Sequence, residues 1–111
     1  MLHKEARIRT GREYRQVYQD GKRLVGKYII IYWKENQRPV NRFGIVTSKK
    51  VGQAVIRNRA KRQLRAIARS SANKIRGNYD IVVVARTSIK DSAFEMIEKD
   101  FQLLIKRARL C

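Results

Sequence analysis

The chain has few of the residues that protein-based catalytic and metal sites need. Its 111 residues include nine Asp and Glu, one His and one Cys. The lone Cys111 cannot form an internal disulfide or supply a zinc cluster, and the single His3 is expected to lie in a frayed terminus. An enzyme that acts with its own side chains needs acid–base groups or metal-binding carboxylates. Because the few carboxylates show no pairing in the sequence, we expect no protein catalytic residues and no metal site.

Long apolar runs are also missing. The longest, residues 28–33, is far shorter than the roughly 20 residues that span a bilayer, and the chain begins with charged residues and no apolar leader segment. A single cysteine fits a reducing compartment. No repeat, low-complexity tract or Gly/Ser linker divides the chain. We therefore expect one domain over residues 1–111, in the cytoplasm and away from the membrane.

The dominant property is positive charge. Lys and Arg number 27, which gives a net charge of +18 and a pI near 11.0. Self-repulsion of this size in a small fold is commonly offset by a polyanion, whose condensed counterions are released on binding. Nucleic acid is the favoured partner, with a membrane surface or a heparin-like polymer as alternatives.

The first half of the chain predicts a helix and two extended runs. Thr10 and Glu13 have capping-box spacing, so a helix is expected from there to about Asp20, with Tyr14, Val17 and Tyr18 on one face. Residues 24–33 and 43–48 are rich in β-branched and aromatic side chains. The intervening residues 36–41 contain the only proline. The pattern therefore predicts an antiparallel hairpin of these two runs, with an extra short strand possible within 24–33.

The second half predicts a helix, a buried strand and a terminal helix. Residues 51–71 have helical periodicity, and residues 79–85 form a continuous apolar run typical of a strand buried on both faces. A last helix is expected from near residues 91–92, because six apolar side chains form a stripe at helical spacing: Phe94, Ile97, Phe101, Leu104, Ile105 and Ala108. The expected order is α-β-β-(β)-α-β-α.

The helix over residues 51–71 lies in a segment without acidic residues. Between Glu35 and Asp80 the chain has no Asp or Glu but twelve Lys and Arg. Solvated helix faces usually mix both signs, because like charges repel. At about 100° per residue, one face carries the apolar residues and the opposite face carries Asn58, Lys61, Arg62, Arg65 and Arg69. This face predicts a nucleic-acid interface, although a helix that reads DNA fits the composition too.

The order of the residues narrows the partner. Ser48-Lys49-Lys50-Val51-Gly52 is followed by Arg57-Asn58-Arg59 and then by Lys61, Arg62 and Arg65. This pattern resembles the signature of the bacterial ribonuclease P protein family. Residues 13–22 and 79–86 resemble the flanking segments of that family. Tyr14 and Tyr18 stand where phenylalanine is common in that family. A tyrosine keeps the stacking face of the ring and adds a polar hydroxyl at its tip.

The resemblance implies a fold and a division of labour. The fold is an α+β arrangement, an α/β sandwich of the ribosomal protein S5 domain 2-like class, with a βαβ crossover of the unusual left hand. The implied activity is removal of the 5′ leader from precursor tRNA, performed by the RNA subunit with Mg²⁺. The protein itself is expected to hold no cofactor, to be a monomer alone, and to join the ribonuclease P RNA as a single copy.

Two binding surfaces are implied by the same resemblance. The surface that faces the RNA subunit comprises Lys50, Arg57, Asn58, Arg59, Lys61, Arg62, Arg65 and Arg69. The cleft that binds the single-stranded leader comprises Tyr14, Tyr18, Tyr32, Lys49 and Arg57. Aromatics interleaved with basic residues suit an unpaired strand of variable sequence. Periodicity alone equally allows Tyr14 and Tyr18 to be core residues, and it leaves the sheet face of Tyr32 open.

Three other functions remain as alternatives. A ribosomal or other structural RNA-binding protein would carry the same charge. A transcription factor would place residues 51–69 in the DNA major groove, but the preceding segment reads as a strand and not as the partner helix of a helix-turn-helix. An independent enzyme would cleave precursor tRNA without any RNA subunit.

Overall fold

The computed structural model describes residues 4–111. The elements follow the predicted order, and the optional extra strand is present. The helices and strands are α1 (Gly11–Asp20), β1 (Lys22–Val25), β2 (Ile29–Glu35), β3 (Arg42–Val46), α2 (Ala54–Ser71), β4 (Tyr79–Ala85) and α3 (Phe94–Arg107). Short 3₁₀ turns are η1 (Lys4–Ala6), η2 (Lys49–Val51), η3 (Ala72–Lys74) and η4 (Thr87–Asp91).

The four strands form one mixed sheet in the order β1-β2-β4-β3. β1 and β4 pair antiparallel with β2, whereas β3 pairs parallel with β4. The predicted hairpin between residues 24–33 and 43–48 is therefore wrong. The hairpin lies within the first run, between β1 and β2, and β4 separates β2 from β3. The physical reason is that β4 is apolar on both faces, so it is most stable at the centre of the sheet with a partner on each side.

Asp100 of α3 holds the tight β1–β2 connection. Its buried carboxylate accepts hydrogen bonds from the backbone N–H groups of Lys27 (3.1 Å), Tyr28 (2.8 Å) and Ile29 (3.3 Å). These contacts join residues more than 70 positions apart, so no local pattern in the sequence indicates them.

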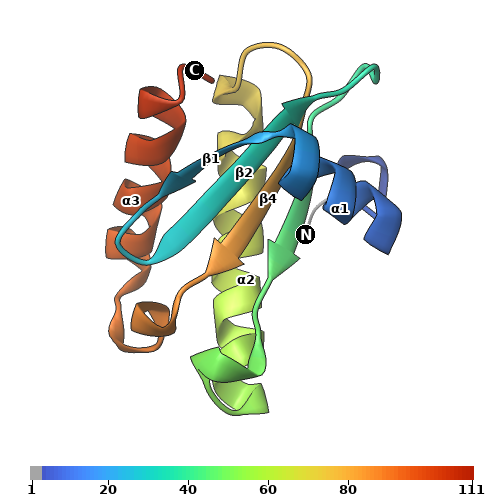
Figure 1. Cartoon of the computed structure of the whole chain (residues 1–111). Helices are drawn as coiled ribbons and strands as arrows, with labels where there is room; N and C mark the ends of the chain where they lie inside the picture. Colours follow the sequence, from blue (N-terminus) through green and yellow to red (C-terminus); the bar gives the residue numbers. More distant parts are fainter. Residues whose placement is uncertain (1–3) are drawn as a thin grey trace.

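The β3–α2–β4 crossover is left-handed. Figure 1 shows β3 and β4 running in the same direction, α2 behind the sheet, and β4 to the left of β3. A chain that descends along β3, returns upwards behind the sheet and comes forward again to the left makes a left-handed turn. About 98% of such connections are right-handed. The hand implied by the family resemblance is thus confirmed.

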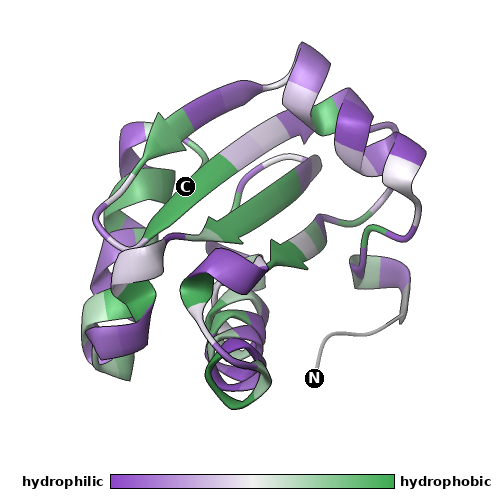
Figure 2. Ribbon diagram, turned by 60° about the horizontal axis from the view of Figure 1, so that its bottom comes forward, coloured by the Kyte–Doolittle hydropathy of each residue, from purple (hydrophilic) through white to green (hydrophobic). Residues whose placement is uncertain are grey.

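The sheet separates two cores. α2 and α3 cover one face, here called the back face, and α1 lies on the other, the front face (Figures 1 and 2). The back-face core is the larger one and includes Ile31, Phe43, Leu64, Ile81 and Phe101, all almost fully buried. The front-face core consists of Ile8, Val17 and Val82, with partly buried tyrosines around them.

The front face is organised in three rows that run across the strands. Strand registers place Arg42, Asp80 and Lys34 side by side in the first row. The second row, which lies under α1, is Gly44, Val82, Tyr32 and Arg23. The third row is Val46, Val84, Ile30 and Val25. Every second residue of a strand points to the same face, so these rows follow from the register.

Candidate nucleic-acid interface

α2 presents the predicted basic face. Ala60, Leu64, Ile67 and Ala68 are buried against the sheet. The predicted residues Asn58, Arg59, Arg62, Arg65 and Arg69 are exposed, as is Lys50 in η2, whereas Arg57 and Lys61 are partly buried at the flank of the helix. The helix begins at Ala54, three residues later than expected, because residues 49–51 form the 3₁₀ turn η2.

Three arginines of this face share one surface hollow. Arg62, Arg65 and Arg69 line it together with Ala66 and Ser70. Their spacing of three and four residues places them on the same side of successive turns. Guanidinium groups at such spacing suit consecutive phosphates of a nucleic acid backbone, which they bind bidentately.

The arginines on either side of Asn58 are turned away from that hollow. Arg57 donates from Nε to the Gly52 carbonyl oxygen (3.2 Å), which ties the side chain to the turn before α2. Arg59 donates from Nη2 to the Lys90 carbonyl oxygen (2.9 Å) in η4. Asn58 is exposed between them. The motif therefore spreads around the first turns of α2 and does not form a single cluster.

The basic face of α2 has no carboxylate partners among residues 4–111. The ion pairs in this part of the chain are Arg38–Glu13, Arg42–Glu13 and Arg42–Asp80. The first turn of α2 also lacks acidic residues, so the positive end of the helix dipole adds to the side-chain charge. An arginine face without internal neutralisation attracts a polyanion.

The three predicted tyrosines come together between α1 and the sheet. The Tyr18 and Tyr32 rings meet edge to face, with centroids 4.8 Å apart and an interplanar angle of 81°. Tyr14 lies against the backbone of Gly44, where the missing side chain makes room for its ring. Tyr32 therefore belongs to the front face, a question that strand alternation left open. Its ring lies on the same side of the sheet as both α1 tyrosines.

The tyrosines combine packing with exposure. Tyr14 and Tyr32 pack on the front-face core, and Tyr18 remains 39% exposed. Burial raises the pKa of Tyr18, and nearby Tyr32 and Tyr14 raise it further. Burial also raises the pKa of Tyr14, although Arg65 opposes the effect. Both hydroxyls thus stay protonated at neutral pH. Half-buried neutral rings of this kind can serve as core residues and as stacking platforms together.

Lys49 and Arg57 lie apart from the tyrosines. Lys49 is in η2, beyond the end of β3 and five residues after Gly44. Arg57 lies in the first turn of α2 next to that 3₁₀ turn. The five predicted leader-binding residues therefore form no single compact pocket: the tyrosines lie between α1 and the sheet, and Lys49 and Arg57 lie at the turn before α2 and in its first turn.

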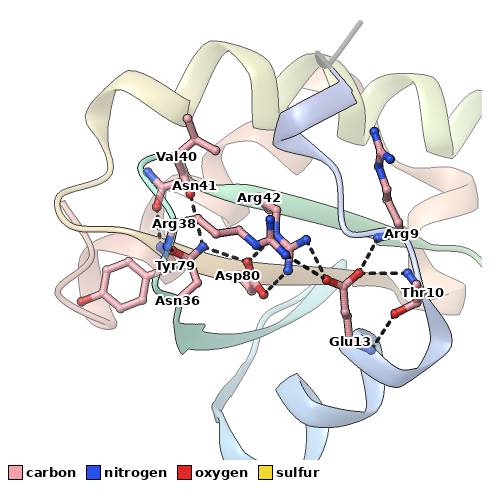
Figure 3. Close-up of polar contacts among 10 residues, drawn as sticks. All are labelled: Arg9, Thr10, Glu13, Asn36, Arg38, Val40, Asn41, Arg42, Tyr79 and Asp80. Carbon is pink, nitrogen blue, oxygen red and sulfur yellow. Dashed lines mark hydrogen bonds and ion pairs between the residues drawn. The ribbon is translucent and has the colours of Figure 1, made fainter.

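A buried arginine, which the sequence analysis did not single out, fixes α1 on the sheet. Figure 3 shows Arg42 between Glu13 of α1 and Asp80 of β4. Arg42 donates from Nη1 to Glu13 Oε2 (2.8 Å), from Nε to Asp80 Oδ1 (2.9 Å) and from Nη2 to Asp80 Oδ2 (2.7 Å). Arg42 is only 5% exposed. Its proximity to Asp80 and Glu13 raises its pKa, despite the opposing effect of burial.

Glu13 joins this arginine to the start of α1. The predicted capping box is confirmed: the Thr10 hydroxyl accepts from the Glu13 N–H (3.1 Å), and Glu13 Oε1 accepts from the Thr10 N–H (3.1 Å). Burial raises the pKa of Glu13, but hydrogen bonds from Arg42, Thr10 and Arg9 outweigh this effect and lower the pKa to about 2. The sequence gives one signal for this pairing of Glu13 with Arg42, namely the small number of acidic residues. In a basic chain, each carboxylate has many cations available to pair with.

The described residues include neither a cluster of metal-ligating side chains nor a helix that could span a membrane. Within residues 4–111, no three His, Cys, Asp or Glu side chains lie close enough together to hold a metal ion. None of the helices in that part of the chain is long and apolar enough to cross a bilayer. His3 lies outside the described residues.

Comparison with known proteins places the chain in a family. The family model described as Ribonuclease P matches residues 2–109. The ribonuclease P protein component of Syntrophomonas wolfei is 56% identical over 110 residues, covering 99% of this chain and 92% of that protein. The protein of the same name from Clostridioides difficile is 41% identical, covering 90% and 89%.

Solved structures agree with the sequence relatives. The ribonuclease P protein of Staphylococcus aureus superposes with a TM-score of 0.86 at 29% identity, covering 95% of this chain and 96% of that one. The Thermotoga maritima protein superposes with a TM-score of 0.83 at 30% identity, covering 91% and 96%.

The left-handed α+β sheet, the arginine face and the tyrosines define a basic protein of the nucleic-acid-binding class. More particularly, the chain belongs to the ribonuclease P protein family. Proteins of this family are subunits of an endoribonuclease that matures the 5′ end of tRNA, and their partner is the ribonuclease P RNA.

Proposed function

We propose that this protein binds two RNA segments. The basic face of α2 binds the ribonuclease P RNA, and the tyrosines between α1 and the sheet, namely Tyr14, Tyr18 and Tyr32, bind the unpaired 5′ leader of precursor tRNA. The supporting observation is that the two surfaces lie mainly on opposite faces of the sheet and approach each other where the charge of Arg65 acts on Tyr14. The hollow between Arg62, Arg65 and Arg69 belongs to a helix on the back face, whereas the Tyr18–Tyr32 pair lies on the front face. One protein can therefore bind two RNA segments at the same time.

The α2 surface suits a structured RNA partner. Exposed arginines without carboxylate partners bind phosphates bidentately, and each phosphate that they neutralise releases condensed counterions. Asn58 has both donors and acceptors, so it suits a base edge or a 2′-hydroxyl. The remaining predicted contacts, Lys50, Arg59 and Lys61, surround this surface at the N-terminal half of the helix.

The tyrosine surface suits an unpaired strand of variable sequence. Every base has a π face, and stacking on an aromatic ring contributes about 1–3 kcal/mol per base. Tyr18 is exposed enough to receive a base, and Tyr32 supports its ring from the sheet. Lys49 and Arg57, at the turn before α2 and in its first turn, supply charge for the leader phosphates nearest to the RNA subunit.

The RNA subunit performs the cleavage in this proposal. It holds the Mg²⁺ ions that the reaction needs, while the protein alone is a monomer without a cofactor and joins as a single copy. Assembly takes place in the cytoplasm. Reconstitution tests this division of labour: the protein restores precursor cleavage by a bacterial ribonuclease P RNA at low Mg²⁺ and cleaves nothing alone.

The leader assignment is tested by comparing substrates. Holoenzyme affinity is measured for precursor tRNA and for mature tRNA, with the unmodified protein and with Tyr18→Ala and Tyr18→Phe. We expect Tyr18→Ala to weaken precursor binding by about tenfold, the loss of one stacked base, and to leave mature tRNA binding unchanged. Tyr18→Phe, which keeps the ring, is the matched control. Equal enhancement of both tRNAs by the protein contradicts the proposal and favours a structural RNA-binding scaffold.

The RNA-subunit assignment is tested by salt dependence. Arg62→Ala, Arg65→Ala and Arg69→Ala are each expected to weaken assembly with the RNA subunit and to reduce the log–log salt slope by about one. Arg107→Ala changes an exposed arginine in the last turn of α3 and is the matched control. Unchanged slopes in the α2 variants would place that helix away from the RNA.

A further inference from the structure

The front face offers more binding surface than the tyrosines cover. α1 lies over the second row of the front face, with Tyr14 against Gly44, Val17 packed with Val82 and the Tyr18 ring against Tyr32. The third row runs parallel to α1 and consists of Val46, Val84, Ile30 and Val25, hereafter the apolar floor. All four side chains are at least partly exposed, and Val25 is 44% exposed.

The apolar floor lies beside α1 on the front face of the sheet. Figure 2 shows the half of the sheet away from α1 uncovered, with hydrophobic colour in the adjoining parts of β2 and β4. Four strands at a spacing of about 4.8 Å make the apolar floor roughly 14 Å long from β3 to β1. A flat apolar surface beside tyrosine rings suits the unpaired bases of an RNA strand.

Arg23 lies beside the β1 end of the apolar floor. It is the register partner of Tyr32, so it extends the second row by one strand, about 4.8 Å past the last tyrosine. Cross-strand neighbours in an antiparallel pair point to the same face, which places the Arg23 side chain on the front face beside the Tyr32 ring. Arg23 is exposed and takes part in none of the ion pairs found within residues 4–111.

Two carboxylates of the front face are already engaged, whereas Asp20, the last residue of α1, forms no ion pair within residues 4–111. Glu13 and Asp80, the carboxylates of the front-face network, both accept hydrogen bonds from Arg42. β1 and the part of β2 that pairs with it, residues 30–33, contain no acidic residue. Arg23 is therefore an exposed charge beside an apolar surface, without an ion-pair partner within residues 4–111.

A charged residue on an edge strand can also have a purely protective role, because it discourages pairing with other chains. Lys22 is suited to that role on the same strand, and its register partner Trp33 belongs to the back face. Arg23 differs from Lys22 in lying on the front face, the face of the apolar floor. A guanidinium at the end of a stacking surface is the group expected to bind a backbone phosphate.

We infer that Arg23 is a further RNA contact, which binds a phosphate of the leader beside the β1 end of the apolar floor. This inference rests on the proposed leader binding. The basic helix α2 packs against β3, at the opposite edge of the sheet, so the nucleotides that reach β1 are those farthest from the RNA subunit. Arg23 therefore acts only on leaders long enough to pass Tyr18 and Tyr32.

The experiment measures holoenzyme affinity for precursor tRNAs whose leaders are lengthened one nucleotide at a time. The proteins compared are the unmodified chain, Arg23→Ala, Arg23→Lys, Lys22→Ala and Tyr18→Ala. We expect Arg23→Ala to weaken binding of long leaders by about three- to tenfold and to lower the salt slope by about one. Shorter leaders that still respond to Tyr18→Ala are unaffected by Arg23→Ala. Arg23→Lys keeps the charge and is expected to retain most of the affinity.

The Lys22→Ala control separates a specific contact from general loss of charge. It removes one cation from the same strand on the other face and is expected to bind all leaders as the unmodified protein does. If Arg23→Ala follows Lys22→Ala at every length while Tyr18→Ala still weakens binding, Arg23 is no RNA contact and the leader proposal stands. If neither Tyr18→Ala nor Arg23→Ala has an effect, the leader proposal itself is wrong and this inference falls with it.

Discussion

The Arg42 guanidinium donates two hydrogen bonds to the Asp80 carboxylate, from Nε to Oδ1 at 2.9 Å and from Nη2 to Oδ2 at 2.7 Å. The two residues are neighbours on the parallel strands β3 and β4. The remaining Nη1 group reaches Glu13 on α1, so one buried side chain joins three elements. Because α1 carries Tyr14 and Tyr18, this arrangement also sets the position of the tyrosine surface.

Arg42→Ala is expected to lower the free energy of unfolding by about 3–5 kcal/mol, because it leaves two carboxylates without their buried partner. Urea denaturation followed by circular dichroism measures the change. Arg38→Ala is the matched control: Arg38 also pairs with Glu13, at 3.5 Å, but its side chain is 54% exposed. Exposed pairs contribute about 0–1 kcal/mol. Similar losses in the two variants would contradict the structural role of Arg42.

The stability of the fold is expected to depend on pH through Glu13. Its pKa of about 2 in the folded protein lies below the ordinary value of 4.5, so the charged form stabilises the fold. This stabilisation is fully present above pH 4.5 and is lost as the pH falls towards 2, with a total of about 2–3 kcal/mol. Glu13→Gln retains a capping side chain without the charge. The variant should lack this part of the acid dependence in denaturation curves between pH 5 and 2. An unchanged acid dependence would show that the Glu13 carboxylate is not stabilised by folding.

Gly44 is expected to control the position of Tyr14. A Cβ atom at residue 44 would lie 2.5 Å from the Tyr14 ring carbon Cε1, so Gly44→Ala forces the ring away from the sheet. We expect a destabilisation of about 1–3 kcal/mol and weaker binding of leader-bearing precursor. In a Tyr14→Ala background the same change should cost much less, because the two effects are coupled. Gly11→Ala, whose Cβ meets only an arginine side-chain atom at 3.6 Å, is the control. Additive effects of the two changes would contradict the close approach.

Arg109 is expected to be replaceable by glycine with a gain in stability. Its φ of 61° is left-handed, and it occupies the turn that ends α3, where the Leu110 N–H donates to the Ile105 carbonyl oxygen at 2.9 Å. Glycine adopts this conformation without the Cβ penalty, so Arg109→Gly should raise the free energy of unfolding by about 0.5–1 kcal/mol. Arg107→Gly, within the helix, should lower it by about 1 kcal/mol. Thermal and urea unfolding compare the pair. A loss of stability in Arg109→Gly would show that the arginine side chain contributes more than the strain costs.

Local patterns in the sequence predicted the elements well. The capping box located the start of α1, the apolar run at residues 81–84 predicted a strand buried on both faces, and helical periodicity separated the buried face of α2 from the basic one. These features depend on neighbours within about four positions, so a single sequence carries them. The motif around Arg57-Asn58-Arg59 indicated the family, and the comparisons with known proteins confirm it.

Strand pairing could not be read in the same way. Residues 24–33 and 43–48 looked like partners because they are close in the sequence, yet β4, more than 30 residues later, lies between β2 and β3. The left hand of the crossover came from the family resemblance, since periodicity carries no information on hand. Both properties depend on contacts between distant segments, which local propensity does not encode.

The sequence by itself determined which residues carry charge and aromatic rings. It also determined that a polyanion must offset the net positive charge. Only the tertiary structure decided where those residues meet. It placed Tyr32 under Tyr18, turned Arg59 towards η4 and aligned Arg23 with the tyrosines across the sheet. The physical reason is strand register, because a shift of one residue moves every side chain to the other face, and register is set by long-range packing.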